Sequence, residues 1–215
     1  MSETIDGPRA RYRRQVRAEV IEHAWAQIAD AGASALSLKA IAAGMGMTGP
    51  ALYRYFAGRD ELLTELILTA YADLADAVEN AATHSAATQS ASDRSGASAQ
   101  QRLEDLAAAL RRWALANPQR YLLLYGTPVP GYDAPPEATA LARRIFTPVL
   151  EACTAAGRGR GAPRTAPDAF TASVTFWTRL HGVLSLELAG HLIGMDVDPA
   201  LLYANEARSV ITGTR

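Results

Sequence analysis

The sequence predicts an all-α protein of about nine helices, and three observations support this fold class. Apolar residues recur at intervals of three and four over most of the 215 residues, as they do on one face of an amphipathic helix. Glycine, proline and small capping residues stand where these periodic stretches begin and end. No stretch has the sustained alternation of apolar and polar residues that is typical of a half-buried strand.

The first predicted helix runs from about Tyr12 to Ala31, and residues 1–10 before it are expected to be disordered. Gly32 suits the position that follows a helix, because glycine readily adopts a positive φ. The apolar face of this helix consists of Ile21, Ala24, Trp25 and Ile28. We expect Trp25 to anchor a small core.

Two short helices joined by a tight turn are predicted between Ser37 and Gly58. Ser37 is a suitable N-cap for the first, and glycines 44 and 46 end it. Thr48 can cap the second helix, which tolerates Pro50 in its first turn. This spacing predicts a helix-turn-helix, in which the second helix enters a DNA major groove. From periodicity alone, a generic helical hairpin is an equal alternative.

A long helix follows from Arg59 to about Asn80, with a broad apolar stripe made of Leu62, Leu63, Leu66, Ile67, Ala70, Tyr71 and Leu74. Further helices are expected over residues 100–116, 119–125, 136–156, 167–193 and 199–211. The residues of 167–193 that are expected to face inward are Phe170, Val174, Trp177, Leu180, His181, Leu184 and Leu188. Residues 83–99 are rich in serine, threonine and alanine, which predicts a flexible loop, and residues 157–166 predict a basic loop. The expected domains are an N-terminal one, residues 1–58, and a C-terminal one, residues 59–215.

Charge is distributed unevenly along a chain whose formal net charge is −1. Residues 1–60 carry eight Lys or Arg against six Asp or Glu, and five arginines lie between Arg9 and Arg17. In front of a helix-turn-helix, this cluster is interpreted as a basic arm that grips phosphate. The alternative is a solvated helix end.

Cys153 is the only cysteine, which excludes a disulfide within the chain and a cysteine zinc cluster. No metal and no cofactor are predicted. No apolar run approaches the roughly 20 residues that span a bilayer, and the N-terminus lacks the apolar core of a signal peptide. We therefore expect a cytoplasmic protein with no membrane partner.

The run from Gly46 to Leu62, GMTGPALYRYFAGRDEL, closely resembles the N-terminal domain of TetR-family transcriptional regulators. That family usually has a histidine where this chain has Tyr55 and a lysine where it has Arg59. Both changes keep a hydrogen-bond donor, so phosphate contact is retained, but the pH sensitivity of a histidine is lost.

A second resemblance lies near the C-terminus, where Trp177, His181 and Gly182 match the Trp-His-Gly type of TetR C-terminal domain. Together the two resemblances cover nearly the whole chain apart from the termini and residues 83–99. They imply a one-component regulator that binds a double-stranded DNA operator. We expect a repressor, although an activator stays open, because the sign of regulation depends on operator position.

The predicted DNA contacts combine this resemblance with the chemistry of the side chains. Thr48, Tyr53 and Tyr55 are expected to bind phosphate, and Arg54 either reads guanine or neutralises phosphate. The complete predicted set is Arg13, Arg14, Ser37, Lys39, Thr48, Gly49, Pro50, Ala51, Tyr53, Arg54, Tyr55 and Arg59. Leu52 and Phe56 are expected in the core.

One recognition helix makes too few contacts for a specific site, so a two-fold dimer on a palindromic operator is expected. The resemblance implies that helices 167–193 and 199–211 pair with those of a second copy. The small residues Gly182, Ser185, Ala189 and Gly190 would permit close approach. Alternatively, these residues pack inside one subunit.

The aromatic residues of the C-terminal region are candidates to line a cavity for a small, largely apolar effector of unidentified structure. They are Trp113, Tyr121, Tyr125, Phe146, Phe170 and Trp177, with His181 as a polar fixing point. An ordinary helical core is the alternative for each of them. Glu187 and His191 are spaced for an intrahelical hydrogen bond rather than a metal site.

An enzyme is not expected, because no phosphate-binding glycine loop, nucleophile elbow or paired carboxylate motif occurs in the sequence. A second alternative is a helical ligand-binding or interaction protein that does not bind DNA. The helix-turn-helix pattern and the basic arm argue against it.

Overall fold

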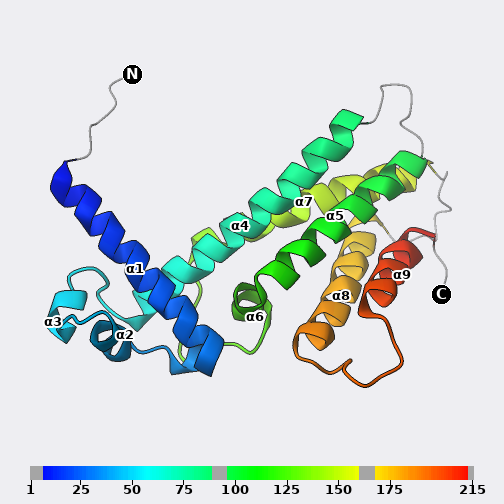
Figure 1. Ribbon diagram of the computed structural model, residues 1–215. Coiled ribbons are helices and arrows are strands. Elements are labelled where there is room, and N and C mark those ends of the chain that lie inside the picture. The colour runs from blue at the N-terminus through cyan, green and yellow to red at the C-terminus, as the bar shows by residue number, and fades with distance from the viewer. Residues whose placement is uncertain (1–6, 89–95, 160–167, 213–215) are drawn as a thin grey trace. The chain divides into compact units, whose positions relative to one another are not determined.

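The computed structural model describes residues 7–88, 96–159 and 168–212, and over these it is built of helices (Figure 1). They fold into nine α-helices and one short 3-10 helix, η1 (Ala33–Ala35). This confirms the predicted all-α fold. The chain divides into two compact units: the first extends to Thr69 and includes Thr127–Pro135, and the second contains the rest. The division thus falls at residues 69 and 70, inside a helix, whereas the sequence suggested 58 and 59.

Helix α1 (Pro8–Ala31) begins four residues before the predicted start. Pro8 occupies its first position, where a missing N–H costs nothing and the fixed φ favours the helix. Residues 8–10 are therefore helical, and residues 1–6 of the stretch expected to be disordered lie outside the described residues. Gly32 ends α1 with a φ of 77°, and its N–H donates to the Ile28 carbonyl. The buried side chains of α1 are Val16, Val20, Ala24 and Ile28.

Helix α2 (Leu38–Gly44) is closed at both ends by the predicted residues. The Ala40 N–H donates to the Ser37 hydroxyl over 3.4 Å. At the other end Gly46 has a φ of 65°. The N–H groups of residues 46 and 47 donate to the Ala43 and Ala42 carbonyls. This pattern is a Schellman motif, which satisfies the last carbonyls of α2 and reverses the chain.

Helix α3 (Gly49–Leu52) is shorter than predicted, and tight turns continue it to Phe56. Thr48 occupies its N-cap position, but the predicted capping hydrogen bond from the Thr48 hydroxyl is absent. The reason is local: Pro50 has no N–H to offer, and the Ala51 N–H donates to the Thr48 carbonyl instead. The Thr48 side chain is left exposed.

Helix α4 (Arg59–Thr88) is the longest and extends beyond the predicted end at Asn80. Its predicted apolar stripe is confirmed, because Leu62, Leu63, Leu66, Ala70 and Leu74 are fully buried. Helix α5 (Gly96–Ala116) begins before the predicted start. The loop expected over residues 83–99 is therefore wrong at both ends, and its central residues 89–95 lie outside the described part of the chain. Alanine is abundant at both ends of that segment, and it favours helix over loop.

The second unit is a helical bundle around one buried cluster. Helix α5 packs against α7 (Pro136–Gly159) and α9 (Pro199–Thr212), and α8 (Ala169–Leu188) also packs against α7 and α9. The short α6 (Pro118–Tyr125) contacts α5 and α8. Helix α7 includes residues 157–159 of the predicted basic loop, and residues 160–167 lie outside the described residues. The Cys153 thiol is buried.

Helix α8 differs from the prediction at both ends. It starts after Asp168, whose carboxylate accepts a hydrogen bond from the Thr171 N–H over 2.7 Å. It ends at Leu188 rather than at residue 193, because Gly190 adopts a φ of 76° and turns the chain. The helix that follows matches the prediction for 199–211 within one residue.

In the part of the chain that the structure describes, no helix combines the length and the apolar character needed to cross a bilayer.

Candidate nucleic-acid interface

The helix-turn-helix has several exposed polar and aromatic side chains. Lys39 on α2 and Thr48, Tyr53 and Arg54 around α3 are exposed, and 55% of the Tyr53 surface is accessible. Leu52 and Phe56 are completely buried, as predicted. These two buried side chains anchor α3 and the turns that follow it in the core, while the exposed donors remain accessible to solvent.

Most of the remaining predicted contacts of this segment are less accessible. Pro50 is exposed, whereas Ser37, Gly49, Ala51 and Tyr55 are partly buried. A Cβ atom added to Gly49 would meet nothing within 4 Å. The surface beside α3 is therefore open at this point, and small residues line it.

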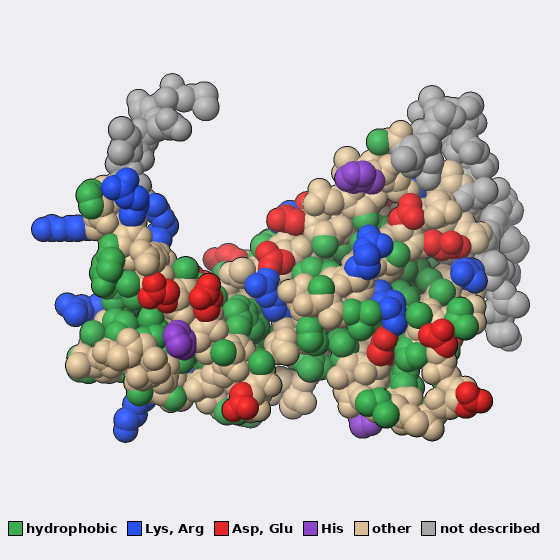
Figure 2. All heavy atoms as spheres, viewed as in Figure 1, with side chains coloured by type: hydrophobic (Ala, Val, Ile, Leu, Met, Phe, Trp, Pro, Cys, Tyr) green, Lys and Arg blue, Asp and Glu red, His purple; other side chains and the backbone are tan. Residues whose placement is uncertain are grey.

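The first turns of α1 carry the exposed part of the basic cluster. Arg9, Arg11, Arg13 and Arg14 are all exposed, and Figure 2 shows Lys and Arg side chains gathered around this end of α1. The structure thus places the arm on a helix and not on an extended tail. Its guanidinium groups are accessible to a phosphate backbone.

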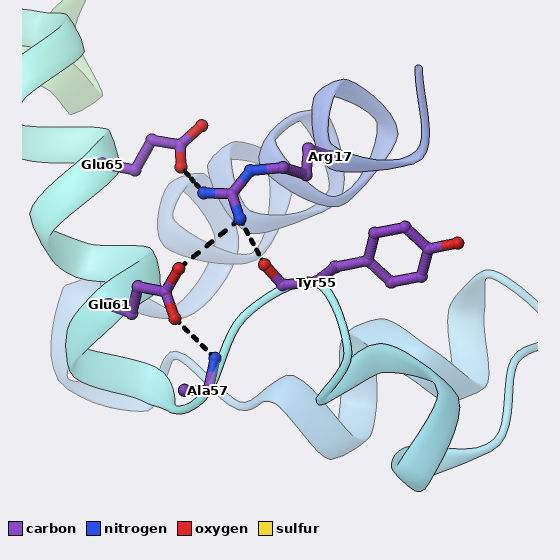
Figure 3. Close-up of polar contacts among 5 residues, drawn as sticks. All are labelled: Arg17, Tyr55, Ala57, Glu61 and Glu65. Carbon is purple, nitrogen blue, oxygen red and sulfur yellow. Dashed lines mark hydrogen bonds and ion pairs between the residues drawn. The ribbon is translucent and has the colours of Figure 1, made fainter. Parts of the chain in front are cut away.

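Arg17 does not belong to this exposed group, and no local pattern in the sequence indicates its role. Its guanidinium donates to the Tyr55 carbonyl and pairs with Glu65, and it lies 3.4 Å from a Glu61 carboxylate oxygen (Figure 3). It also lies 4.0 Å from the centre of the Phe56 ring. Glu61 in turn accepts a hydrogen bond from the Ala57 N–H over 2.6 Å.

Arg59, another predicted DNA contact, is turned toward η1. Its guanidinium lies 3.4 Å from the carbonyl oxygens of Ala33 and Ser34, and it also pairs with Asp60 over 3.8 Å. The contacts with Ala33 and Ser34 connect the start of α4 to η1. They leave Arg59 less free for phosphate than Arg54.

An aromatic cluster occupies the second unit and brings together most of the predicted effector residues. The His181 ring is the centre: its centroid lies 4.3 Å from that of Tyr125, 4.4 Å from Trp177 and 5.5 Å from Tyr121. Tyr71 and Phe146 extend the cluster through edge contacts. Tyr71 was not predicted as an effector residue, because its place on the apolar stripe of α4 suggested plain core.

Polar atoms within the cluster are only partly paired. The Tyr121 hydroxyl lies 2.8 Å from His181 Nδ1 and 3.2 Å from the Ser185 hydroxyl. His181 Nε2 is buried and has no partner within the described residues. Burial lowers the pKa of His181 to about 4 and raises the pKa of Tyr125. His181 is therefore a neutral imidazole at physiological pH, with one ring nitrogen unpaired.

Two predicted effector residues differ from those that surround the His181 ring. Trp113 is buried in the same hydrophobic cluster as Tyr121. Phe170 is 60% exposed, and its ring contacts that of Phe146 at the edge of the cluster, with 6.0 Å between the ring centroids. A cleft of about 440 Å³ in this unit is lined by other residues, mainly alanines and polar side chains of α4 and α5.

Glu187 does not make the predicted intrahelical bond with His191. It accepts a hydrogen bond from Arg111 over 2.5 Å, and α8 has already ended before residue 191. Among the described residues, no three His, Cys, Asp or Glu side chains gather in a way that could hold a metal ion.

The outer face of α8 is apolar and exposed, which contradicts the inward orientation predicted for two of its residues. Phe170 and Val174 were expected in the core but are exposed, whereas Ser173 and Phe176 are buried in their place. The exposed row repeats every four residues: Phe170, Val174, Thr178, Gly182 and Leu186. Ser185 faces inward, toward Tyr121.

Comparisons with known proteins agree with this architecture. A model described as bacterial regulatory proteins of the tetR family matches residues 20–66. A second, described as the tetracyclin repressor-like C-terminal domain, matches residues 103–210, which include the Trp177–Gly182 motif. The chain is 35% identical to the HTH-type transcriptional regulator Rv1816 of Mycobacterium tuberculosis, over 95% of this chain and 94% of that protein.

Solved structures extend the similarity to the whole fold. The regulatory protein SCO4313 superimposes with a TM-score of 0.78 at 50% sequence identity, over 96% of this chain and 100% of that one. The TetR family regulator PfmR from Thermus thermophilus has a TM-score of 0.64 at 19% identity, over 91% and 98% of the chains, and supports the fold alone. The chain therefore belongs to the TetR family of helix-turn-helix transcriptional regulators.

Proposed function

We propose that this regulator is a one-component repressor, which binds a palindromic operator as a dimer and is released by a small, largely apolar effector. The observation that carries the proposal is the exposure of Lys39, Thr48, Tyr53 and Arg54 on a helix-turn-helix whose Leu52 and Phe56 are buried. As a regulator of transcription it would act in the cytoplasm, where its operator is. An activator would use the same contacts at a different operator position.

The DNA contacts follow from the accessibility of each donor. The Thr48 hydroxyl makes no capping bond, so it is available to a phosphate oxygen. The Tyr53 and Tyr55 phenols extend the phosphate contacts, and Arg54 is the long donor that reaches a base edge or a phosphate. Ser37, Arg13 and Arg14 add phosphate contacts, and the small residues 49–51 permit close approach to thymine methyl groups.

Dimerisation is supported by the exposed apolar row on α8. A second copy that packs on this row would remove Phe170, Val174 and Leu186 from water, with Gly182 at the point of closest approach. Leu201 on α9 is also 64% exposed. A two-fold pair would provide two recognition helices for two half-sites.

Effector binding is supported by the aromatic cluster around His181. Its neutral ring, with Nε2 unpaired, suits one hydrogen bond to an otherwise apolar molecule. Helix α4 contributes residues 59–69 to the first unit and Tyr71 to the cluster. A change in the tilt of α4 on effector binding would alter the separation of the recognition helices and mismatch the half-sites.

The test is fluorescence anisotropy with the DNA upstream of its own gene, measured at several salt concentrations. We expect the double variant Tyr53→Phe/Tyr55→Phe to bind about tenfold more weakly, as expected for two lost phosphate contacts. Tyr132→Phe is the matched control in the same unit, because the Tyr132 hydroxyl is bonded to Thr64 over 3.0 Å. Undiminished binding by the double variant would refute these contacts. A folded dimer that binds no host DNA at low salt would instead favour a helical ligand-binding protein without a DNA-binding role.

A further inference from the structure

Arg17 differs from its neighbours in the basic cluster. Only 24% of its side chain is accessible, whereas Arg9, Arg11, Arg13 and Arg14 are exposed. The position on α1 explains the difference, because Arg17 directly follows the buried Val16 and lies one turn before the buried Val20. Its side chain is therefore directed along the edge of the buried face and not toward solvent.

The guanidinium of Arg17 connects three elements of the first unit. It extends from α1 to the Tyr55 carbonyl, at the end of the helix-turn-helix, and to Glu61 and Glu65 in the first two turns of α4 (Figure 3). Stacking over Phe56 fixes the plane of the group. A planar, forked cation is suited to this task, because it can hold several acceptors at once.

The segment that Arg17 holds is the one that places a predicted phosphate contact. Arg17 binds the carbonyl of Tyr55 at the start of this segment, and Glu61 binds the N–H of Ala57 at its end. Figure 3 shows the Tyr55 ring directed away from the guanidinium. With two carboxylates and a carbonyl already bound, Arg17 has little capacity left for a phosphate.

We propose that Arg17 is a positioning residue for DNA binding, which clamps the end of the helix-turn-helix to the start of α4 and thereby orients Tyr55. It acts through the protein and makes no phosphate contact of its own. The inference rests on the proposed Tyr55 contact, and the experiment below separates the two.

The first measurement is the salt dependence of affinity for a duplex selected from the host genome by the unmodified protein. We expect Arg17→Met to weaken binding by about tenfold while the slope of log affinity against log salt stays unchanged. Arg13→Met is the matched control, since loss of a phosphate contact lowers that slope by about one. A lower slope for Arg17→Met would make Arg17 a phosphate contact and overturn the proposal, as would an unchanged affinity.

Net charge needs a separate control, because Arg17→Met removes one positive charge. The variant Arg17→Met/Glu65→Gln restores the charge balance without restoring the clamp. We expect the DNA affinity of this double variant to remain low. Full recovery of binding would show that Arg17 contributes only through its charge. Arg17→Lys keeps the charge but not the fork, so we expect it to rescue binding only in part. Arg17→Lys also decides the question if Arg17→Met does not fold.

The second measurement is a double-mutant cycle between Arg17→Met and Tyr55→Phe. If Arg17 positions Tyr55, the loss of affinity caused by Tyr55→Phe should shrink in the Arg17→Met background, whereas the loss caused by Lys39→Met should not. Full additivity at Tyr55 would refute the positioning role. If Tyr55→Phe has no effect in the otherwise unmodified protein, the assignment of Tyr55 as a phosphate contact is wrong. The affinity and the salt slope of Arg17→Met then decide alone whether Arg17 has a positioning role.

Discussion

Gly182 gives the most direct test of the proposed dimer, because it is exposed in the middle of the apolar row on α8. A Cβ atom added there would meet nothing within 4 Å. Replacing a glycine inside a helix by a better helix former stabilises the helix by about 0.5–1 kcal/mol. Gly182→Glu should therefore leave the fold of one subunit intact or slightly stabilise it.

The effect on association should have the opposite sign. Overpacking a close helix contact costs about 1–3 kcal/mol at each site. A two-fold interface contains the site twice, so the cost is about 2–6 kcal/mol, or about 30-fold to 30,000-fold in the dimer dissociation constant. Two facing carboxylates would add repulsion to this value.

Sedimentation equilibrium over a range of protein concentrations measures the dissociation constant, and circular dichroism checks the helix content. Thr147→Glu is the control, because it adds the same charge at an exposed position of α7. We expect the control to remain as dimeric as the unmodified protein. If Gly182→Glu dimerises with unchanged affinity, the α8 row is not the interface. If Gly182→Glu loses helix content, then position 182 does not accept a side chain even within one subunit.

Two further predictions concern stability. The pKa of His181 is lowered by burial from 6.5 to about 4, so between these pH values the unfolded chain binds a proton that the folded chain does not. The free energy of unfolding should therefore fall by about 3 kcal/mol as the pH drops from 6.5 to 4. In urea titrations, His181→Gln should lack this part of the pH dependence. An identical pH dependence in both proteins would contradict a neutral buried imidazole. Ser37→Ala should lower the free energy of unfolding by about 0.5–1 kcal/mol through loss of its cap. Thr48→Ala removes no capping bond, so it should weaken DNA binding and leave the free energy of unfolding unchanged. Equal destabilisation by the two alanine variants would show that Thr48 caps α3 after all.

Much of the fold could be predicted because helix ends are specified locally. Gly32 and Gly46 act through their own backbone geometry, and Ser37 acts through its hydroxyl. All three signals can be read directly from the sequence. The prediction was wrong where the local sequence favoured helix and loop almost equally. Residues 83–88 extend α4 because they contain no glycine or proline to end a helix, although their serine and threonine residues suggested a loop.

The buried face of α8 could not be predicted from the sequence, for a different reason. This helix has two apolar faces, and periodicity alone does not decide which one is buried. The face with Ser173 and Phe176 is inside, and the one with Phe170 and Val174 is outside. The Arg17 contacts were equally invisible, because they join residues 38 to 48 positions apart.

The boundary between the compact units lies within α4, and this constrains how such regulators can exchange parts. A chimera joined at residues 58 and 59 would take Glu61 and Glu65 from a foreign helix and separate Arg17 from its partners. A junction after Thr69 would keep them, yet Tyr132, whose hydroxyl bonds to Thr64, would still come from the other parent. The transferable module is thus discontinuous in sequence, and recombination that preserves it has to carry two separate pieces of the gene.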